Sequence, residues 1–140
     1  MKVYLDASLL VALFTNDALT ARAEKFLRAR APLLIVSDFA AAEFASAVAR
    51  RARMGELKPY EARSAFADFD SWTARATERI RIEPADVAGA DAFLRRLDLS
   101  LRAPDAVNIA IAQRAGAELA TFDDKMAKGA RALKTSVSAI

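Results

Sequence analysis

Short apolar segments alternate with longer helix-like segments from one end of the 140-residue chain to the other. The apolar segments predict five strands, at residues 3–5, 33–36, 80–82, 119–122 and 135–138. Helical patterns lie around and between them, at residues 8–14, 17–30, 38–54, 59–72, 84–97, 104–116 and 124–132. Residues 33–36 are continuously apolar, which is typical of a strand covered on both faces. The alternation therefore predicts an α/β fold in which helices cover both sides of a parallel sheet of about five strands.

Several residues mark where the helices begin and end. Asn16 and Asp17 can cap the second helix, and Ser37 or Asp38 can cap the third, which Gly55 can end. Three later helices begin at a proline, a residue favoured in the first turn: Pro59, Pro84 and Pro104. No repeat, linker or low-complexity segment interrupts the pattern, so we expect one domain that spans residues 1–140.

The residue types that are missing limit the chemistry. The chain contains no cysteine, which excludes disulfides and thiolate metal sites and fits a reducing cytoplasm. It also contains no histidine, which excludes Ser-His-Asp hydrolysis, histidine general-base nuclease chemistry and the usual zinc sites. Any metal ion must be held by oxygen atoms, and this favours Mg²⁺ or Mn²⁺.

The ends of the chain and its charge suggest a soluble protein. The sequence begins with a strand pattern and has no apolar run near the ~20 residues of a membrane span, so we expect a cytoplasmic protein without membrane contact. The net charge is +3, and arginine outnumbers lysine. Arginine binds phosphate in a bidentate fork, so the excess indicates either a phosphate-binding surface or a generally arginine-rich composition.

Four carboxylates lie in four separate segments. Asp6 and Asp123 each follow an apolar run, Asp105 opens a helix behind a proline, and Glu43 lies inside an alanine-rich helix. Side chains at the carboxyl ends of parallel strands converge on the crevice where open α/β folds bind ligands. Two such charges about 5 Å apart repel by roughly 3 kcal/mol at an effective dielectric constant near 20. A divalent ion removes that cost, so the pattern predicts a metal-dependent enzyme.

Each aspartate of this set also has a structural explanation. Asp6, Asp105 and Asp123 can each cap or open the helix that follows, and Asp124 beside Asp123 can do the same. Glu43 is different, because its helical neighbours three and four residues away include no cation. A glutamate in that position faces either a cavity or a distant cation. Capping explains the aspartates one by one but does not explain Glu43.

Four segments of the chain resemble the signature blocks of the PIN-domain family, and the similarity is greatest to the VapC-type ribonuclease toxins of type II toxin–antitoxin systems. The segments are Val-Tyr-Leu-Asp6-Ala-Ser, Glu43 in its helix, Leu-Arg-Ala-Pro-Asp105-Ala and Thr-Phe-Asp123. They occur in the family's order across nearly the whole chain, and the Thr-x-Asp pattern selects Asp123 over Asp124. Asn108 stands where many relatives carry histidine, which puts substrate or partner preference in question.

The resemblance implies a three-layer α/β/α fold and a divalent-metal-dependent endoribonuclease. In that family Asp6 and Asp105 would be the first ligands of Mg²⁺ or Mn²⁺, and Asp123 and Glu43 would complete the catalytic set directly or through water. Mg²⁺ keeps several waters in proteins, and one of them can attack the phosphodiester to leave a 5′-phosphate and a 3′-hydroxyl. Two hydroxyls would orient the carboxylates: Ser8 and Thr121. The resemblance also implies an antitoxin partner and a homodimer.

Three arginines lie near the acidic residues along the chain. Arg50 and Arg51 follow Glu43 on the same helix, and Arg102 precedes Pro104. They can contact RNA or the antitoxin, or Arg50 and Arg51 can simply favour the negative end of their helix. Two other interpretations of the chain stay open: an inactive PIN-like scaffold that binds RNA or protein, and a receiver-type signalling domain. The receiver class needs an acidic pair after the first strand, where Asp6 stands alone.

Overall fold

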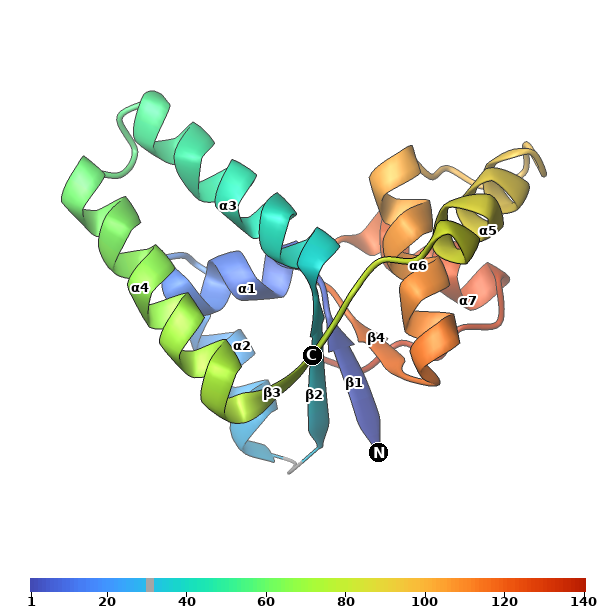
Figure 1. Ribbon diagram of the computed structural model, residues 1–140, viewed down its shortest axis with the longest axis horizontal. Helices are drawn as coiled ribbons and strands as arrows, with labels where there is room; N and C mark the ends of the chain where they lie inside the picture. Colours follow the sequence, from blue (N-terminus) through green and yellow to red (C-terminus); the bar gives the residue numbers. More distant parts are fainter. Residues whose placement is uncertain (30–31) are drawn as a thin grey trace.

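A computed structural model describes residues 1–29 and 32–140 of the chain (Figure 1). Within these residues it has four strands, β1 (Lys2–Leu5), β2 (Leu33–Ser37), β3 (Thr77–Ile80) and β4 (Glu118–Ala120). It has seven helices in the same residues, α1 (Ala7–Phe14), α2 (Thr20–Ala29), α3 (Asp38–Arg53), α4 (Pro59–Ala76), α5 (Pro84–Leu94), α6 (Ala103–Ala115) and α7 (Asp124–Ala132). None of these helices combines the length and the apolar character that crossing a membrane requires.

The four strands form one parallel sheet in the order β3-β2-β1-β4. Tyr4 of β1 pairs with Ile35 of β2 on one side and with Leu119 of β4 on the other. The chain therefore places β2 and β3 on one edge of β1, and it then returns to place β4 on the other edge. The strand order reverses at β1, and the carboxyl ends of β1, β2 and β4 lie where α/β folds form ligand crevices.

Helices cover both sides of the sheet, as the alternating pattern predicts. In Figure 1, α1–α4 lie on one side of the strands and α5–α7 on the other. The buried strand residues Val3, Tyr4 and Leu5 form the centre of the hydrophobic core. This arrangement confirms the expected three-layer α/β/α architecture.

The aromatic side chains of the first layer fix the rotation of α3. Phe44 of α3 stacks on Phe69 of α4, with ring centroids 4.5 Å apart, and meets Phe14 of α1 edge-to-face at 5.9 Å. Such ring pairs have preferred geometries in addition to the apolar area that they bury. Because Phe44 is held in this layer, its neighbour Glu43 is turned away from it.

The sheet edges differ from the sequence pattern. We expected a strand at residues 80–82, but β3 ends at Ile80, and the backbone N–H of Ile82 instead donates to the side chain of Asp38 at 2.8 Å. No residue of β3 is fully buried, so apolar residues do not mark its limits. The expected fifth strand at residues 135–138 is reduced to a bridge between Val137 and Leu119, because β4 is only three residues long and offers little edge to pair with.

Most helix limits follow the local signals, with three differences. Ser37 caps α3 by accepting a hydrogen bond from the Ala40 N–H, and Gly116 ends α6 with φ of 64°. Asp17 forms a turn before α2 by accepting from the Leu19 N–H, so α2 begins three residues after it. The expected end of α2 at about Arg30 lies outside the described residues. Helix α4 is four residues longer than expected, and α5 ends three residues earlier.

Candidate active site

Asp6 lies at the point where β1 passes into α1, and it is only 5% exposed. Its Oδ1 accepts hydrogen bonds from Ser8 Oγ at 2.7 Å and from the Leu9 N–H at 3.2 Å, and its Oδ2 accepts from Thr121 Oγ1 at 2.6 Å. Every one of these donors is neutral. Burial raises the pKa of Asp6; these three hydrogen bonds oppose the increase, and the charge of Asp123 adds to it.

The hydroxyls of Ser8 and Thr121 join the ends of β1 and β4. Besides binding Asp6, Thr121 Oγ1 accepts from the Asp123 N–H at 3.0 Å, and Ser8 Oγ accepts from the Phe122 N–H at 2.9 Å. The turn that carries Asp123 is thereby tied to the carboxylate of Asp6. The structure thus places both predicted hydroxyls in contact with Asp6, and their effect on catalysis stays a prediction.

Glu43 reaches the site from α3 and is held by Asn108 of α6. Asn108 Nδ2 donates to Glu43 Oε1 at 2.6 Å and to the Pro104 carbonyl at 2.9 Å, while its Oδ1 accepts from the Tyr4 hydroxyl at 2.6 Å. The Tyr4 hydroxyl also lies 2.6 Å from Ser37 Oγ. Burial raises the pKa of Glu43; the Asn108 hydrogen bond lowers it, the charges of Asp6 and Asp105 raise it, and Arg102 lowers it.

Sequence reasoning noticed Asn108 only as a departure from relatives and did not single out Tyr4 or Ser37 as its partners. The signal that could have found Asn108 is its position one helical turn after Asp105, between the apolar residues Val107 and Ile109. A buried amide needs hydrogen-bond partners, and here it connects Glu43 to the sheet. Burial strongly raises the pKa of Tyr4, so its hydroxyl stays protonated and keeps a donor for this network.

Asp105 and Asp123 line a common cleft of about 440 Å³. Asp105 Oδ2 accepts from the Arg102 N–H at 3.0 Å, and Asp123 Oδ1 accepts from the Met126 N–H at 3.0 Å. Each aspartate of the set therefore does serve a helix start, as the structural explanation proposed. One oxygen of each, Oδ1 of Asp105 and Oδ2 of Asp123, makes no hydrogen bond or ion pair with the described residues. Capping and ligand binding are thus compatible.

The four acids are electrostatically coupled but do not form a closed metal cage. No three acidic side chains among residues 1–29 and 32–140 approach closely enough to hold one ion directly. Within the described residues, Arg102 is the cation that lowers the pKa of Glu43, and its side chain is 81% exposed and therefore weakly effective. An all-oxygen donor set with unshared oxygens fits Mg²⁺ or Mn²⁺, which bind through few carboxylates and several waters.

The three arginines expected near RNA or an antitoxin occupy different environments. Arg51 is engaged inside the protein, because it pairs with Asp17 at 2.8 Å and donates to Thr15 Oγ1 at 3.1 Å. Its hydrogen bond and charge lower the pKa of Asp17. Arg50 is exposed near the end of α3, and Arg102 lines the cleft with Asp105 and Asp123. Arg102 is therefore the arginine that the structure brings to the acids, and Arg51 holds α3 to the loop after α1.

Comparison with known proteins places this arrangement in a family. The PIN-domain family model matches residues 3–132, and the chain therefore belongs to the PIN-domain family. Among curated proteins, it is 32% identical over 140 residues to ribonuclease VapC46 of Mycobacterium tuberculosis, covering 98% of this chain and 96% of the relative. Family membership excludes the receiver-type interpretation.

Solved structures show the same fold at lower identity. M. tuberculosis VapC20, described as a sarcin-ricin loop cleaving toxin, aligns with a TM-score of 0.74 and 19% identity over 90% of this chain and 93% of that one. A toxin–antitoxin complex from Klebsiella pneumoniae aligns with a TM-score of 0.63 and 21% identity over 91% of each chain. At these identities the likeness establishes the fold, and the roles of individual residues must be argued from their contacts.

Proposed function

We propose that this chain is a divalent-metal-dependent endoribonuclease that acts as the toxin of a toxin–antitoxin pair. The observation that carries the proposal is the buried Asp6, which has only neutral hydrogen-bond donors and is repelled by a neighbouring acid at the strand-order reversal of a PIN-domain fold. Curated relatives across the whole chain are ribonucleases, and a structural neighbour is part of a toxin–antitoxin complex.

Asp6 and Asp105 are the first-choice ligands for Mg²⁺ or Mn²⁺, with Asp123 and Glu43 completing the set directly or through water. When bound, such an ion lowers the pKa of a water molecule and offsets charge on the scissile phosphate. The chain's own contribution is to bring carboxylates of four elements to the same edge of the sheet, where Glu43 senses the charges of Asp6 and Asp105, and Asp105 shares a cleft with Asp123. With no histidine in the sequence, a carboxylate of this set is the side chain that can accept the proton of the attacking water.

Neutral side chains fix the orientation of two of these carboxylates. Ser8 and Thr121 bind opposite oxygens of Asp6, so the carboxyl plane cannot rotate without breaking a hydrogen bond. Asn108 binds Oε1 of Glu43, and Oε2 makes no hydrogen bond or ion pair with the described residues. Groups that orient metal ligands in this way affect metal affinity and activity by roughly 10- to 100-fold.

The proposal includes an antitoxin and a second copy of the chain as protein partners, in a cytoplasmic setting. Binding of an antitoxin is supported by the structural neighbour in a toxin–antitoxin complex. Among the described residues, exposed apolar side chains lie in two places. Met54 follows the end of α3 and Tyr60 lies at the start of α4, while Val87 lies on α5 and Leu97 follows it. These two places are the surfaces to test for such contacts.

Cleavage of a mixed total-RNA pool tests the proposed function. The reaction is run with Mg²⁺, with Mn²⁺ and with neither, using the antitoxin-free protein and the variants Asp6→Asn and Asp105→Asn. The control is Asp91→Asn, which removes an exposed carboxylate on α5 that pairs only with Arg95 at the surface. We expect metal-dependent cleavage by the wild type and the control but not by the other two. Cleavage by Asp6→Asn, or none by a folded wild type, would contradict the proposal, and the latter would favour a binding scaffold.

A further inference from the structure

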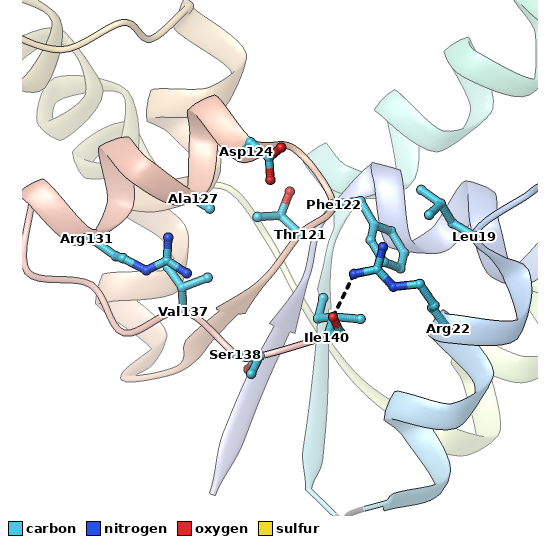
Figure 2. Close-up of a pocket in the computed structure, with 11 residues that line it drawn as sticks. Leu19, Arg22, Thr121, Phe122, Asp124, Ala127, Arg131, Val137, Ser138 and Ile140 are labelled. Atoms are coloured by element: carbon cyan, nitrogen blue, oxygen red, sulfur yellow. Dashed lines mark hydrogen bonds between the residues drawn. The ribbon is translucent and has the colours of Figure 1, made fainter.

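Figure 2 shows a second hollow, which is lined in part by the turn that joins β4 to α7. Its volume is about 370 Å³, and its wall toward the acidic site includes Thr121, Phe122 and Asp124. Asp123, in the middle of the same turn, lines the cleft that contains Asp105. The two hollows thus share one short wall, and Thr121 also binds the carboxylate of Asp6.

Two arginines reach this hollow from opposite sides. Figure 2 shows Arg22 extending from α2 and Arg131 from the last turn of α7. Arg22 Nη2 donates to the carbonyl of Ile140 at 2.8 Å, and its guanidinium lies 5.3 Å from the centre of the Phe122 ring. The guanidinium of Arg131 makes no hydrogen bond or ion pair with the described residues. One guanidinium is therefore held in place, and the other keeps all its donors for a ligand.

The side-chain charge of this hollow favours an anion. Two guanidinium groups face it, against one side-chain carboxylate, that of Asp124. A guanidinium presents parallel donors that match the oxygens of a phosphate. We propose that Arg22 and Arg131 bind a backbone phosphate of the RNA strand next to the scissile bond. This subsite rests on the ribonuclease function proposed above and adds a contact that the acidic set cannot supply.

The position of the hollow is what connects it to RNA. Four carboxylates repel the phosphates of a substrate, so a strand that enters their cleft needs cations immediately beside it. Arg51 cannot serve, because Asp17 already holds it, and Arg102 and Lys125 line the cleft of Asp105 and Asp123 itself and not the hollow beyond the turn. A protein partner would instead need an apolar site in which to bury an anchor side chain. The aromatic ring that lines this hollow, Phe122, is already covered by the Arg22 guanidinium. The observations therefore favour a nucleic acid phosphate over a protein side chain.

Binding of a short fluorescent single-stranded RNA, measured by anisotropy in EDTA, tests the subsite. The protein carries Asp6→Asn to prevent cleavage, and the salt concentration is varied. We expect Arg22→Ala/Arg131→Ala to weaken binding on the order of tenfold at 0.1 M salt and to reduce the slope of log K against log[salt] by about 1.4, since each lost contact with a single strand removes roughly 0.7.

Matched variants separate phosphate binding from a general loss of charge or structure. Arg63→Ala/Arg75→Ala removes two exposed arginines of α4 and should leave affinity within about twofold and the slope unchanged. Arg22→Lys/Arg131→Lys keeps both charges and should keep most of the slope. Arg131→Ala alone breaks no side-chain hydrogen bond or ion pair with the described residues, so it should give about half the slope change in a fully folded protein. Equal effects of the two double-alanine variants would overturn the subsite.

Cleavage kinetics distinguish failure of the subsite from failure of the ribonuclease assignment. In the presence of the supporting metal, Arg22→Ala/Arg131→Ala should raise KM for RNA by more than it lowers kcat. A wild type that cleaves RNA while this variant keeps the same KM and salt slope overturns the subsite alone. A folded wild type that neither cleaves nor binds RNA overturns the ribonuclease function and the subsite together.

Discussion

Two aspartates of this protein are almost completely buried, and their surroundings are opposite. Asp86 of α5 is 2% exposed and receives two hydrogen bonds of 2.9 Å from one guanidinium, that of Arg114 on α6. Asp6 is 5% exposed and, within residues 1–29 and 32–140, receives hydrogen bonds only from two hydroxyls and one backbone N–H. Among these residues Asp86 is paired with a cation and Asp6 is not.

The pKa values of the two carboxyls follow this difference. Burial acts to raise the pKa of Asp86, but the hydrogen bonds from Arg114 and from the Glu83 N–H, together with the Arg114 charge, outweigh it and leave the pKa lowered. For Asp6 burial prevails, and the pKa is raised. A buried carboxylate without a cation is costly, and this cost at a strand end supports the proposal that a metal ion binds beside Asp6.

Asp86 and Arg114 also serve the acidic site indirectly. Arg114 donates to the Arg81 carbonyl at 2.8 Å and lies 3.4 Å from Glu83, so it joins the start of α5 to the end of α6. Helix α6 carries Asp105 near its start. Asp86 therefore helps to hold the scaffold, and we propose that the scaffold holds Asp6 for chemistry. Each role can be tested by substitution.

The largest expected difference is in RNA cleavage. Asp6→Asn removes a proposed metal ligand and should lower the cleavage rate by at least 1,000-fold, about 4 kcal/mol in the activation free energy. Asp86→Asn leaves the ligands unchanged and should keep the rate within about tenfold at a temperature where it is folded. Initial rates on one RNA substrate measure both. Equal losses in the two variants would contradict the division of roles.

Stability should show the reverse order. Arg114→Ala leaves Asp86 buried without its cation and should lower the free energy of unfolding by about 3 kcal/mol. Asp6→Asn removes an uncompensated buried charge and should lower it by less than about 1 kcal/mol or raise it. Urea unfolding at pH 7 without divalent ions measures both values. The account of Asp6 is wrong if its substitution is the more destabilising of the two.

The stabilisation by Asp86 should depend on pH in a definite direction. Its pKa is lowered in the folded protein, so its contribution is fully present above the unfolded value of about 3.9 and is lost as the pH falls through the folded value. The difference in unfolding free energy between wild type and Asp86→Asn should be constant between about pH 7 and 5 and should shrink below about pH 4. Urea unfolding at several pH values checks this, and a difference that already shrinks above pH 5 would contradict it.

The smallest expected effect concerns Asn108. Asn108→Ala removes the hydrogen bond to Glu43 and should lower the cleavage rate by roughly tenfold, since groups that orient metal ligands act in that range. The chain's other asparagine, Asn16, is exposed, and Asn16→Ala should leave the rate unchanged. Initial rates across a series of metal concentrations separate the two variants. A rate for Asn108→Ala equal to that of Asn16→Ala would remove Glu43 positioning from the account.

Local signals in the sequence were sufficient for much of the fold. Strands β1 and β2 follow apolar runs, and two helices are limited by the caps Ser37 and Gly116. These features depend on residues that are neighbours in the chain, so the sequence pattern predicts them. The limits of the edge strand β3 could not be predicted, because this strand has no buried face to mark them. Residues 135–138 form a single bridge with β4. The extent of this pairing depends on the length of β4, which residues 135–138 do not reveal.

The same distinction applies to the site. Asp6, Asp105 and Asp123 could be found because each lies at a helix start that the local sequence reveals. The contacts of Asn108 could not, because its partners Tyr4 and Glu43 lie 104 and 65 residues away in the chain. The ion pair of Asp86 with Arg114 spans 28 residues and was equally hidden, although it decides how the two buried aspartates differ.

Calorimetric titration of the protein with Mn²⁺ tests the central claim most directly, because it reports binding of the proposed metal ion at Asp6 without depending on RNA. The wild type, Asp6→Asn and the surface control Asp91→Asn are compared at pH 7. We expect the wild type and Asp91→Asn to bind Mn²⁺ with the same affinity, and Asp6→Asn to bind it at least tenfold more weakly. Equal Mn²⁺ affinity for the wild type and Asp6→Asn would contradict the claim that this buried carboxylate is kept for a metal ion.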